Sequence, residues 1–339
     1  MNAVPSTSPN APAKHRIADG STFSAGALLR RWETLLLGVL ALVVIIGSFA
    51  LRDFLDPYNL ADATFNFSEK ALIALAMALL IIVREIDISV SAIIAVASVA
   101  MGYANTLGMP PLGLALIGLV VGALCGAFNG LLVTHFGIPS IVVTIGTMSL
   151  YRGIALVVLG DQAYTNYPAA LSEWGQGYWA GIPREFIVLL VFAALFALLL
   201  HGTSIGRRLY AIGANPVAAR FSGIRVDRYR FALFVLVGTM AGLAAVLLTA
   251  RIGSTRPNIA LGWELEAITM VILGGVSIAG GAGTIAGVLL AVFTLGMVTY
   301  ALGLANVPGI IMTIVIGALL LVTITVPALL RLRGGTARH

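Results

Sequence analysis

Cysteine and lysine are almost absent from this sequence of 339 residues. Its single cysteine, Cys125, excludes an intramolecular disulfide framework and any metal site built from several cysteines. Neither of its lysines, Lys14 and Lys70, lies in a Gly-x-x-x-x-Gly-Lys-Ser/Thr loop, so the chain has no Walker-type phosphate-binding loop. If ATP drives this protein, another subunit hydrolyses it.

Charged residues are also scarce. They make up 10% of the chain, against 59% hydrophobic residues and a mean hydropathy of +1.02, whereas soluble domains average about 25% charged residues. A chain this apolar cannot cover its surface with polar side chains, so we expect a lipid bilayer to be its solvent. The net charge of +6 is compatible with nucleic-acid binding, but the basic residues sit in short loops between apolar runs. This pattern indicates membrane topology and no nucleic-acid partner.

Catalytic motifs are missing as well. The histidines (His15, His135, His201 and His339) are scattered, and the chain contains neither a His-Glu-x-x-His nor a Gly-x-Ser-x-Gly pattern nor clustered metal ligands. We therefore predict no catalytic residue, no metal site and no enzyme activity in this chain. A membrane-embedded enzyme remains an alternative that turnover by the purified chain would reveal.

Long apolar runs fill the rest of the sequence. A spanning helix needs about 20 apolar residues, and on that criterion we predict an all-α polytopic bundle of about ten spans. The second and eighth are predicted to be short, with broken ends. The segments are 33–51, 69–84, 88–107, 111–135, 139–159, 185–202, 230–250, 264–279, 283–303 and 307–327.

The basic residues orient this bundle. Fourteen of the 20 lysines and arginines fall in the N-terminal tail, at Arg84, in the 203–230 loop or from Arg331 onward, which predicts that both termini are cytoplasmic. We expect a disordered cytoplasmic tail over 1–31, a membrane domain over 32–330 and a cytoplasmic tail over 331–339.

Glycine recurs every four residues in the fourth segment, at Gly118, Gly122, Gly126 and Gly130. This spacing places small residues on one helix face, where a second helix can approach closely. It favours packing inside the bundle, although a subunit interface has the same signature. In the eighth segment, Glu264 and Glu266 suit the N-terminus of a helix.

Charge interrupts the apolar pattern from Arg84 to Ser91. Apolar and polar residues alternate there, which is not a helical period and predicts a helix break. One interpretation is a discontinuous helix beside a translocation path, with Asp87, Ser89 and Ser91 facing it. The other is an ordinary cytoplasmic turn, with Asp87 capping the next helix and Arg84 paired with an acid.

Glycines interrupt the pattern a second time. The stretch from Gly274 to Thr284 cannot easily sustain a helix, since each glycine costs about 1 kcal/mol relative to alanine. We predict a broken helix or a re-entrant turn here. The candidate residues are Gly274, Gly275, Ser277, Gly280 and Gly281.

The loop from Thr203 to Arg230 contains a short, well-bounded helix. Asn215 is a favoured N-cap, Pro216 a favoured first residue, and Gly223 a favoured residue after the end. Such a helix could dock into a cytoplasmic partner or lie on lipid. The candidate contact residues are Asn215, Pro216, Ala219, Arg220, Phe221 and Gly223.

Arg152 lies within an apolar run, after the hydroxyl-bearing Thr144 and Thr147. An intramembrane arginine is costly and indicates a functional site, unless its side chain reaches the outer interface. We include all three residues among the candidates for the translocation path.

These motifs occur in an order that resembles a known family. The resemblance covers about residues 33–327 and is to the permeases of ribose- and autoinducer-2-type bacterial ABC importers, in the branched-chain-amino-acid-like permease superfamily. It rests on Ile86-Asp87-Ile88-Ser89-Val90, Asn129-Gly130-Leu131-Leu132, residues 141–147, Arg152-Gly153, residues 211–219 and residues 274–284.

The resemblance implies a transport protein of the bacterial inner membrane. It implies a cytoplasmic ATPase that carries ATP-Mg, a second permease subunit in a homodimer or heterodimer, and a periplasmic solute-binding protein. It also implies that Asn215 to Gly223 form the segment that couples the permease to the ATPase. The solute would be a monosaccharide or a similar molecule.

The chain departs from the family at the first break. Arg84 and Glu85 stand where two glycines are common, and Ser91 stands where a glycine is common. This variant resembles rhamnose or autoinducer-2 members. An ion-coupled secondary transporter is the alternative function, but such proteins keep ionisable residues near the membrane midplane, whereas here charge gathers near the span ends.

Overall fold

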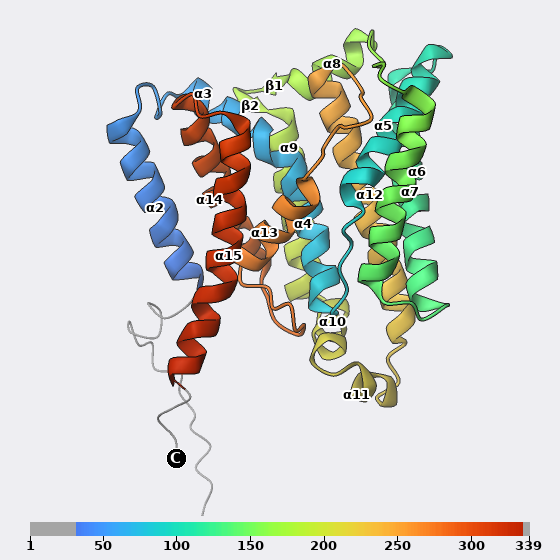
Figure 1. The fold of residues 1–339 in the computed structure, drawn as a ribbon, viewed down its shortest axis with the longest axis vertical. Helices are drawn as coiled ribbons and strands as arrows, with labels where there is room; N and C mark the ends of the chain where they lie inside the picture. Colours follow the sequence, from blue (N-terminus) through green and yellow to red (C-terminus); the bar gives the residue numbers. More distant parts are fainter. Residues whose placement is uncertain (1–31, 335–339) are drawn as a thin grey trace, which may run out of the picture.

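Helices make up most of the computed structural model, which describes residues 32–334 (Figure 1). The predicted tail 1–31 and residues 335–339 lie outside the described part. The elements are α2 (Trp32–Ala50), α3 (Pro57–Ala63), α4 (Phe65–Ile82), α5 (Val90–Thr106), α6 (Pro111–Thr134), α7 (Ser140–Leu159), α8 (Ala169–Gln176), β1 (Tyr178–Trp179), β2 (Ile182–Pro183), α9 (Arg184–Ala197), a π-helical turn (Leu198–Gly202), α10 (Ser204–Ala214), α11 (Pro216–Phe221), α12 (Val226–Ile252), α13 (Trp263–Leu273), α14 (Ile285–Leu304) and α15 (Gly309–Gly334).

Seven helical segments within 32–334 are long and apolar enough to cross a membrane. Helix α5 and the start of α15 are shorter apolar helices, and α13 has 11 residues, too few for a crossing. The eighth predicted segment is therefore short, as expected. The second is not, because α3 and α4 together form a span of 26 residues, Pro57–Ile82. The sequence predicts a shorter span because Glu69 and Lys70 interrupt the apolar run. In the structure both side chains form ion pairs inside the protein.

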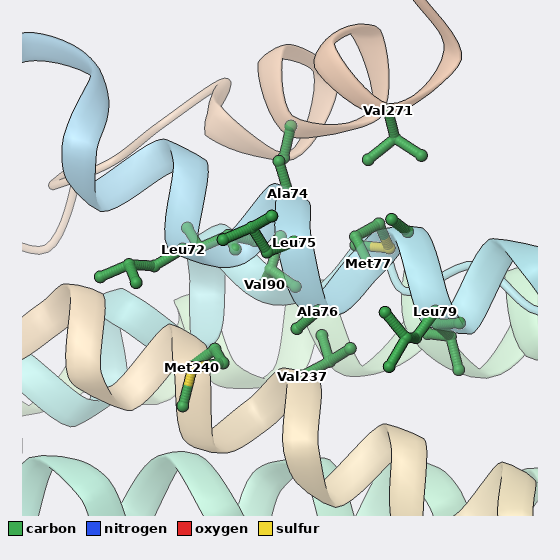
Figure 2. Close-up of a cluster of buried hydrophobic side chains, with 14 of the residues drawn as sticks. Leu72, Ala74, Leu75, Ala76, Met77, Leu79, Val90, Val237, Met240 and Val271 are labelled. Carbon is green, nitrogen blue, oxygen red and sulfur yellow. The ribbon is translucent and has the colours of Figure 1, made fainter. Parts of the chain in front are cut away.

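Helix α4 is the centre of the bundle. Almost all of its side chains are buried, whereas α2 exposes most of its length. Figure 2 shows Leu72, Leu75 and Met77 of α4 among side chains of α12 and α13, including Val237, Met240 and Val271. Lipid is as apolar as leucine, so close packing rather than the hydrophobic effect holds such helices together.

The glycine face of α6 packs against α12. A Cβ added to Gly122 would strike the backbone of Gly238 and Gly242, and one added to Gly126 would strike Phe234 and Gly238. The two backbones therefore touch. The prediction of packing inside the bundle is confirmed, because this face is covered by the same chain.

The ends of the bundle differ. Helices α10 and α11 lie at one end, together with the first residues of α2 and the last residues of α15, while α3, α8 and the β1–β2 hairpin lie at the other (Figure 1). We call the first the α11 end and the second the α8 end. Helix α15 continues through residues 331–334.

Candidate functional site

The first predicted helix break lies between Ile82 and Val90. Arg84 has a φ of 69°, which directs the chain out of the helix. Its side chain donates from Nε to the carbonyl of Gly213 (2.6 Å) and from Nη2 to the carbonyl of Ala214 (2.7 Å). A cation at the last carbonyls of α10 is favourable. The expectation that Arg84 pairs with an acid is wrong, because the nearby acid, Glu85, pairs with Arg230 at 3.1 Å.

Asp87 is fully buried behind this break and is held by hydrogen bonds. Its Oδ1 accepts from the amide (2.8 Å) and hydroxyl (2.6 Å) of Ser89, and its Oδ2 accepts from Nδ2 of Asn129 (3.2 Å). The N-cap of α5 is Ser89, so Asp87 is not itself the cap. Asn129 also accepts from the hydroxyl of Tyr151 at 3.1 Å. The break is thereby bonded to α6 and α7.

Three predicted path residues make no hydrogen bond to this network among the described residues. The hydroxyls of Thr144 and Thr147 donate to carbonyls of their own helix, at 3.5 and 3.4 Å. The buried hydroxyl of Ser91 has no hydrogen-bond partner among the described residues. All three residues are buried, so α5 and α7 carry hydroxyl groups on the faces that they turn into the bundle.

The second predicted break is also present, between Leu273 and Ile285. Gly275, Gly280 and Gly281 have positive φ angles of 83°, 82° and 74°, which residues with side chains rarely adopt. The amide of Ser277 donates to the carbonyl of Ala282 at 3.0 Å and closes a tight loop. Gly274 packs directly against the backbone of α14 at Val288.

The predicted short helix is α11, and its boundaries are those expected. The side chain of Asn215 accepts from the amides of Val217 (3.0 Å) and Ala218 (3.1 Å), Pro216 begins the helix, and Gly223 follows it with a φ of 82°. Ala219 anchors the helix by its buried methyl group.

The outer face of α11 projects from the bundle. Phe221 is 89% exposed, and Val217 beside it is also exposed. Arg220 pairs with Asp227 of α12 at 2.6 Å, and both of these side chains face solvent. An exposed aromatic next to an exposed ion pair is an arrangement typical of a docking surface.

The two breaks and α10 meet at one point, which we call the junction. Gly213 of α10 contacts both Ile82 and Gly281, and a side chain there would strike their backbones. The amide of Gly281 donates to the carbonyl of Ile82 at 2.9 Å. The hydroxyl of Tyr210 donates to the carbonyl of Gly283 at 2.6 Å. The segment that leads into α11 is thus bonded to both helix breaks.

Sequence reasoning had singled out the breaks but not the residues that connect them. Asn129 and Gly213 belong to motifs that carry the family resemblance, but no contact is predicted for them, and none is predicted for Tyr151 or Tyr210. The one available signal was chemical, because a polar amide such as Asn129 inside an apolar run needs a buried partner.

Arg152 lies apart from the junction. Its NH1 atom donates to the carbonyls of Pro257 (2.7 Å) and Ile259 (2.9 Å), so it ties α7 to the connection between α12 and α13. In that region Tyr167 bonds to Thr255 at 2.8 Å, and burial raises the pKa of Tyr167 to about 12, which keeps its hydroxyl neutral. Arg152 therefore does not reach the outer interface as a free side chain.

Residues 32–334 contain no group of three or more His, Cys, Asp or Glu side chains that could hold a metal ion. The junction links an exposed helix to two breaks inside the bundle.

A family model described as the permease component of the branched-chain amino acid transport system matches residues 59–324. The chain belongs to this permease family. The match includes both breaks, the junction and α11. With seven candidate spans, this permease is a multi-pass protein of the bacterial inner membrane and a component of a transporter rather than an enzyme.

Relatives support the same conclusion. The permease is 35% identical to the ribose import permease protein RbsC of Bacillus subtilis over 85% of this chain and 90% of the relative. It is 34% identical to the autoinducer 2 import system permease protein LsrD of Salmonella typhimurium, and 31% identical to LsrD of Photorhabdus luminescens, each over 86% of this chain and 90% of the relative. No solved structure matches this chain.

Proposed function

We propose that this permease is the membrane-spanning subunit of a binding-protein-dependent ABC importer, and that it translocates a monosaccharide or a sugar-like solute. The solute class is supported by relatives whose names specify ribose and autoinducer 2. The candidates are ribose, rhamnose and autoinducer 2. A periplasmic binding protein delivers the solute, and a separate cytoplasmic ATPase binds ATP-Mg.

The junction is the observation that carries this proposal. When ATP closes the two halves of the ATPase, the movement reaches α11 through its exposed face, including Phe221. Helix α10 passes the movement on because Arg84 and Gly281 bind the breaks to one another and to its C-terminal turn. Breaks are the places where a helix can bend at small cost, so α5 and α13 respond by changing access to the pathway.

The proposal places the α11 end in the cytoplasm. Arginines gather there, including Arg84, Arg207, Arg208, Arg225 and Arg228, as the positive-inside rule requires. Both termini are then cytoplasmic. The seven long segments, with α5, α15 and the half-helix α13, make up about ten membrane segments. A second permease subunit completes the pathway, and solute passes between the two.

The ion-coupled transporter is less well supported. Asp87, a buried acid of the break, is already bound by three hydrogen-bond donors from Ser89 and Asn129. The deciding experiment is uptake into cells treated with a protonophore while ATP is maintained. An importer keeps its uptake and loses it when the ATPase is deleted, whereas a proton-coupled carrier shows the opposite.

Arg220→Glu tests the coupling role of α11. The substitution breaks the pair with Asp227 and reverses the charge of the exposed face while the buried Ala219 stays in place. We expect normal insertion, with solute-stimulated ATPase activity and uptake reduced at least about tenfold. The reason is that a charge-assisted contact between Arg220 and the ATPase, if lost, is worth about 1.5–3 kcal/mol. Arg207→Glu makes the same charge change on the exposed face of α10 and serves as the control. Equal activities in the two variants would mean that α11 is not the coupling contact.

A further inference from the structure

Two buried glutamates and a partly buried arginine lie together near the α8 end, between α4, α9 and α12. Arg251 of α12 approaches Glu69 of α4 with its Nε atom 2.8 Å from Oε1, and Glu185 of α9 with Nε 3.9 Å from Oε2. Both glutamate side chains are 0% exposed, and that of Arg251 is 23% exposed. This cluster does not contact the junction and takes no part in the proposed coupling.

The cluster has one positive group and two acids. Oε2 of Glu69 and both carboxyl oxygens of Glu185 have no hydrogen-bond partner among the described residues. A buried carboxylate without a compensating charge or donor is strongly unfavourable. If both acids were ionised, the cluster would hold a net negative charge, with three acceptor atoms left unsatisfied.

Neighbouring cations do not supply the missing charge. Lys70, next to Glu69, is bound to Glu266 of α13 at 2.5 Å. Arg184, next to Glu185, donates to the carbonyl of Glu173 at 2.9 Å and lies over the ring of Trp174 of α8. Helix α14, which also packs on α4 and α9, contains no charged residue.

We propose that Glu69 and Glu185 form a proton-binding site that holds one proton in the folded protein. The proton belongs on Glu185, because Glu69 already has the shorter contact with Arg251. Both carboxyl groups face the same guanidinium group of Arg251. A proton on Glu185 turns one acceptor into a donor and leaves one carboxylate for one guanidinium, so the cluster becomes neutral.

The site makes the stability of the fold depend on pH. A glutamate in the unfolded chain has a pKa of about 4.3 and is ionised at neutral pH. The folded protein therefore binds one more proton than the unfolded chain, and its stability falls as pH rises. The ratio of folded to unfolded protein changes by up to about tenfold for each pH unit.

The test compares thermal unfolding of the full-length chain in detergent between about pH 6 and pH 9, where one proton changes the equilibrium by about tenfold per unit. Wild type should lose stability as pH rises. Glu185→Gln should remove this dependence and keep the wild-type midpoint at low pH, because glutamine is neutral and leaves the Glu69–Arg251 pair intact. Glu173→Gln, which alters an exposed glutamate of α8, should keep the wild-type dependence.

Two further variants separate the proton from mere packing. Glu69→Gln should also remove the pH dependence but should be less stable than Glu185→Gln, since Arg251 must then pair across the longer contact. The double variant should be the least stable, because the partly buried Arg251 is left without an anion. Infrared spectra of wild type should contain a protonated-carboxyl band that disappears in Glu185→Gln.

Parallel pH profiles of wild type and Glu185→Gln would overturn the proposal. A midpoint that rises with sodium concentration in wild type alone would also overturn it and would identify a bound cation instead. If the variants fail to insert, the wild-type infrared spectrum still decides, because a spectrum without a protonated-carboxyl band contradicts the site.

Discussion

Asn129 shows how much a single residue contributes to this permease. Its amide group bonds to Asp87 and Ser89 of the first break, and its carbonyl oxygen accepts from Tyr151 of α7. One side chain on α6 therefore satisfies three buried polar groups from two other segments. Such a network is favourable only when every member is paired.

We predict that Asn129→Leu strongly destabilises the protein. A buried polar group left without a partner costs about 1–3 kcal/mol, and the substitution removes the donor to Oδ2 of Asp87, whereas the hydroxyl of Tyr151 keeps its bond to the carbonyl of Cys125. The free energy of unfolding should therefore fall by about 1–3 kcal/mol. Asn105→Leu is the control, because Asn105 is partly exposed and its side chain bonds to the exposed carbonyl of Asn166. Thermal unfolding of the two variants in detergent measures the difference, and equal midpoints would contradict the role of the network.

At the scale of elements, the ends of two helices, α4 and α13, form the junction with α10. Helix α4 ends at Ile82 and α13 ends at Leu273, and the chain that follows each of them meets α10 at Gly213. Hydrogen bonds from Arg84, Tyr210 and the amide of Gly281 hold these ends together. Backbone contact of this kind leaves little room for independent movement, so α10 and the breaks should shift as one body.

Gly213→Ala tests this contact. A Cβ at this position would strike the carbonyl of Ile82 and the backbone of Gly281, so we expect the junction to open and uptake to fall about tenfold or more, as overpacking commonly costs about 1–3 kcal/mol. Gly146→Ala is the matched control, since Gly146 is also helical and nothing lies within 4 Å of an added Cβ. Uptake and ATPase activity should be measured together, because a loosened junction lowers uptake more than it lowers ATP hydrolysis.

At the scale of the whole molecule, the two ends carry different structures. The α11 end has an exposed helix and many arginines, while the α8 end has a short helix, a hairpin and the Glu69–Arg251–Glu185 cluster. This asymmetry suits a protein in which a cytoplasmic ATPase acts on one end and solute arrives at the other.

Cysteine labelling tests the orientation directly. Cys125 is the single natural cysteine, so Cys125→Ser provides a background without thiols. In that background, Ser222→Cys should react with a membrane-impermeant maleimide only after the cells are opened, because this exposed residue follows α11. Thr165→Cys, an exposed position of the opposite end, should react in intact cells with a permeable outer membrane. The reverse pattern would invert the topology.

The sequence by itself determined that this chain is a polytopic helical membrane protein. It has too few polar side chains to cover a surface in water, and a lipid bilayer is the solvent that suits it. It also located both breaks and the limits of α11, because glycines, charges and an Asn-Pro cap act over a few neighbouring residues. It could not determine the full length of α4 or the partners of Arg84, Asn129 and Glu185. Each of those depends on groups that lie on other elements, 22 or more positions away in the chain. Only the packed bundle brings such groups close together.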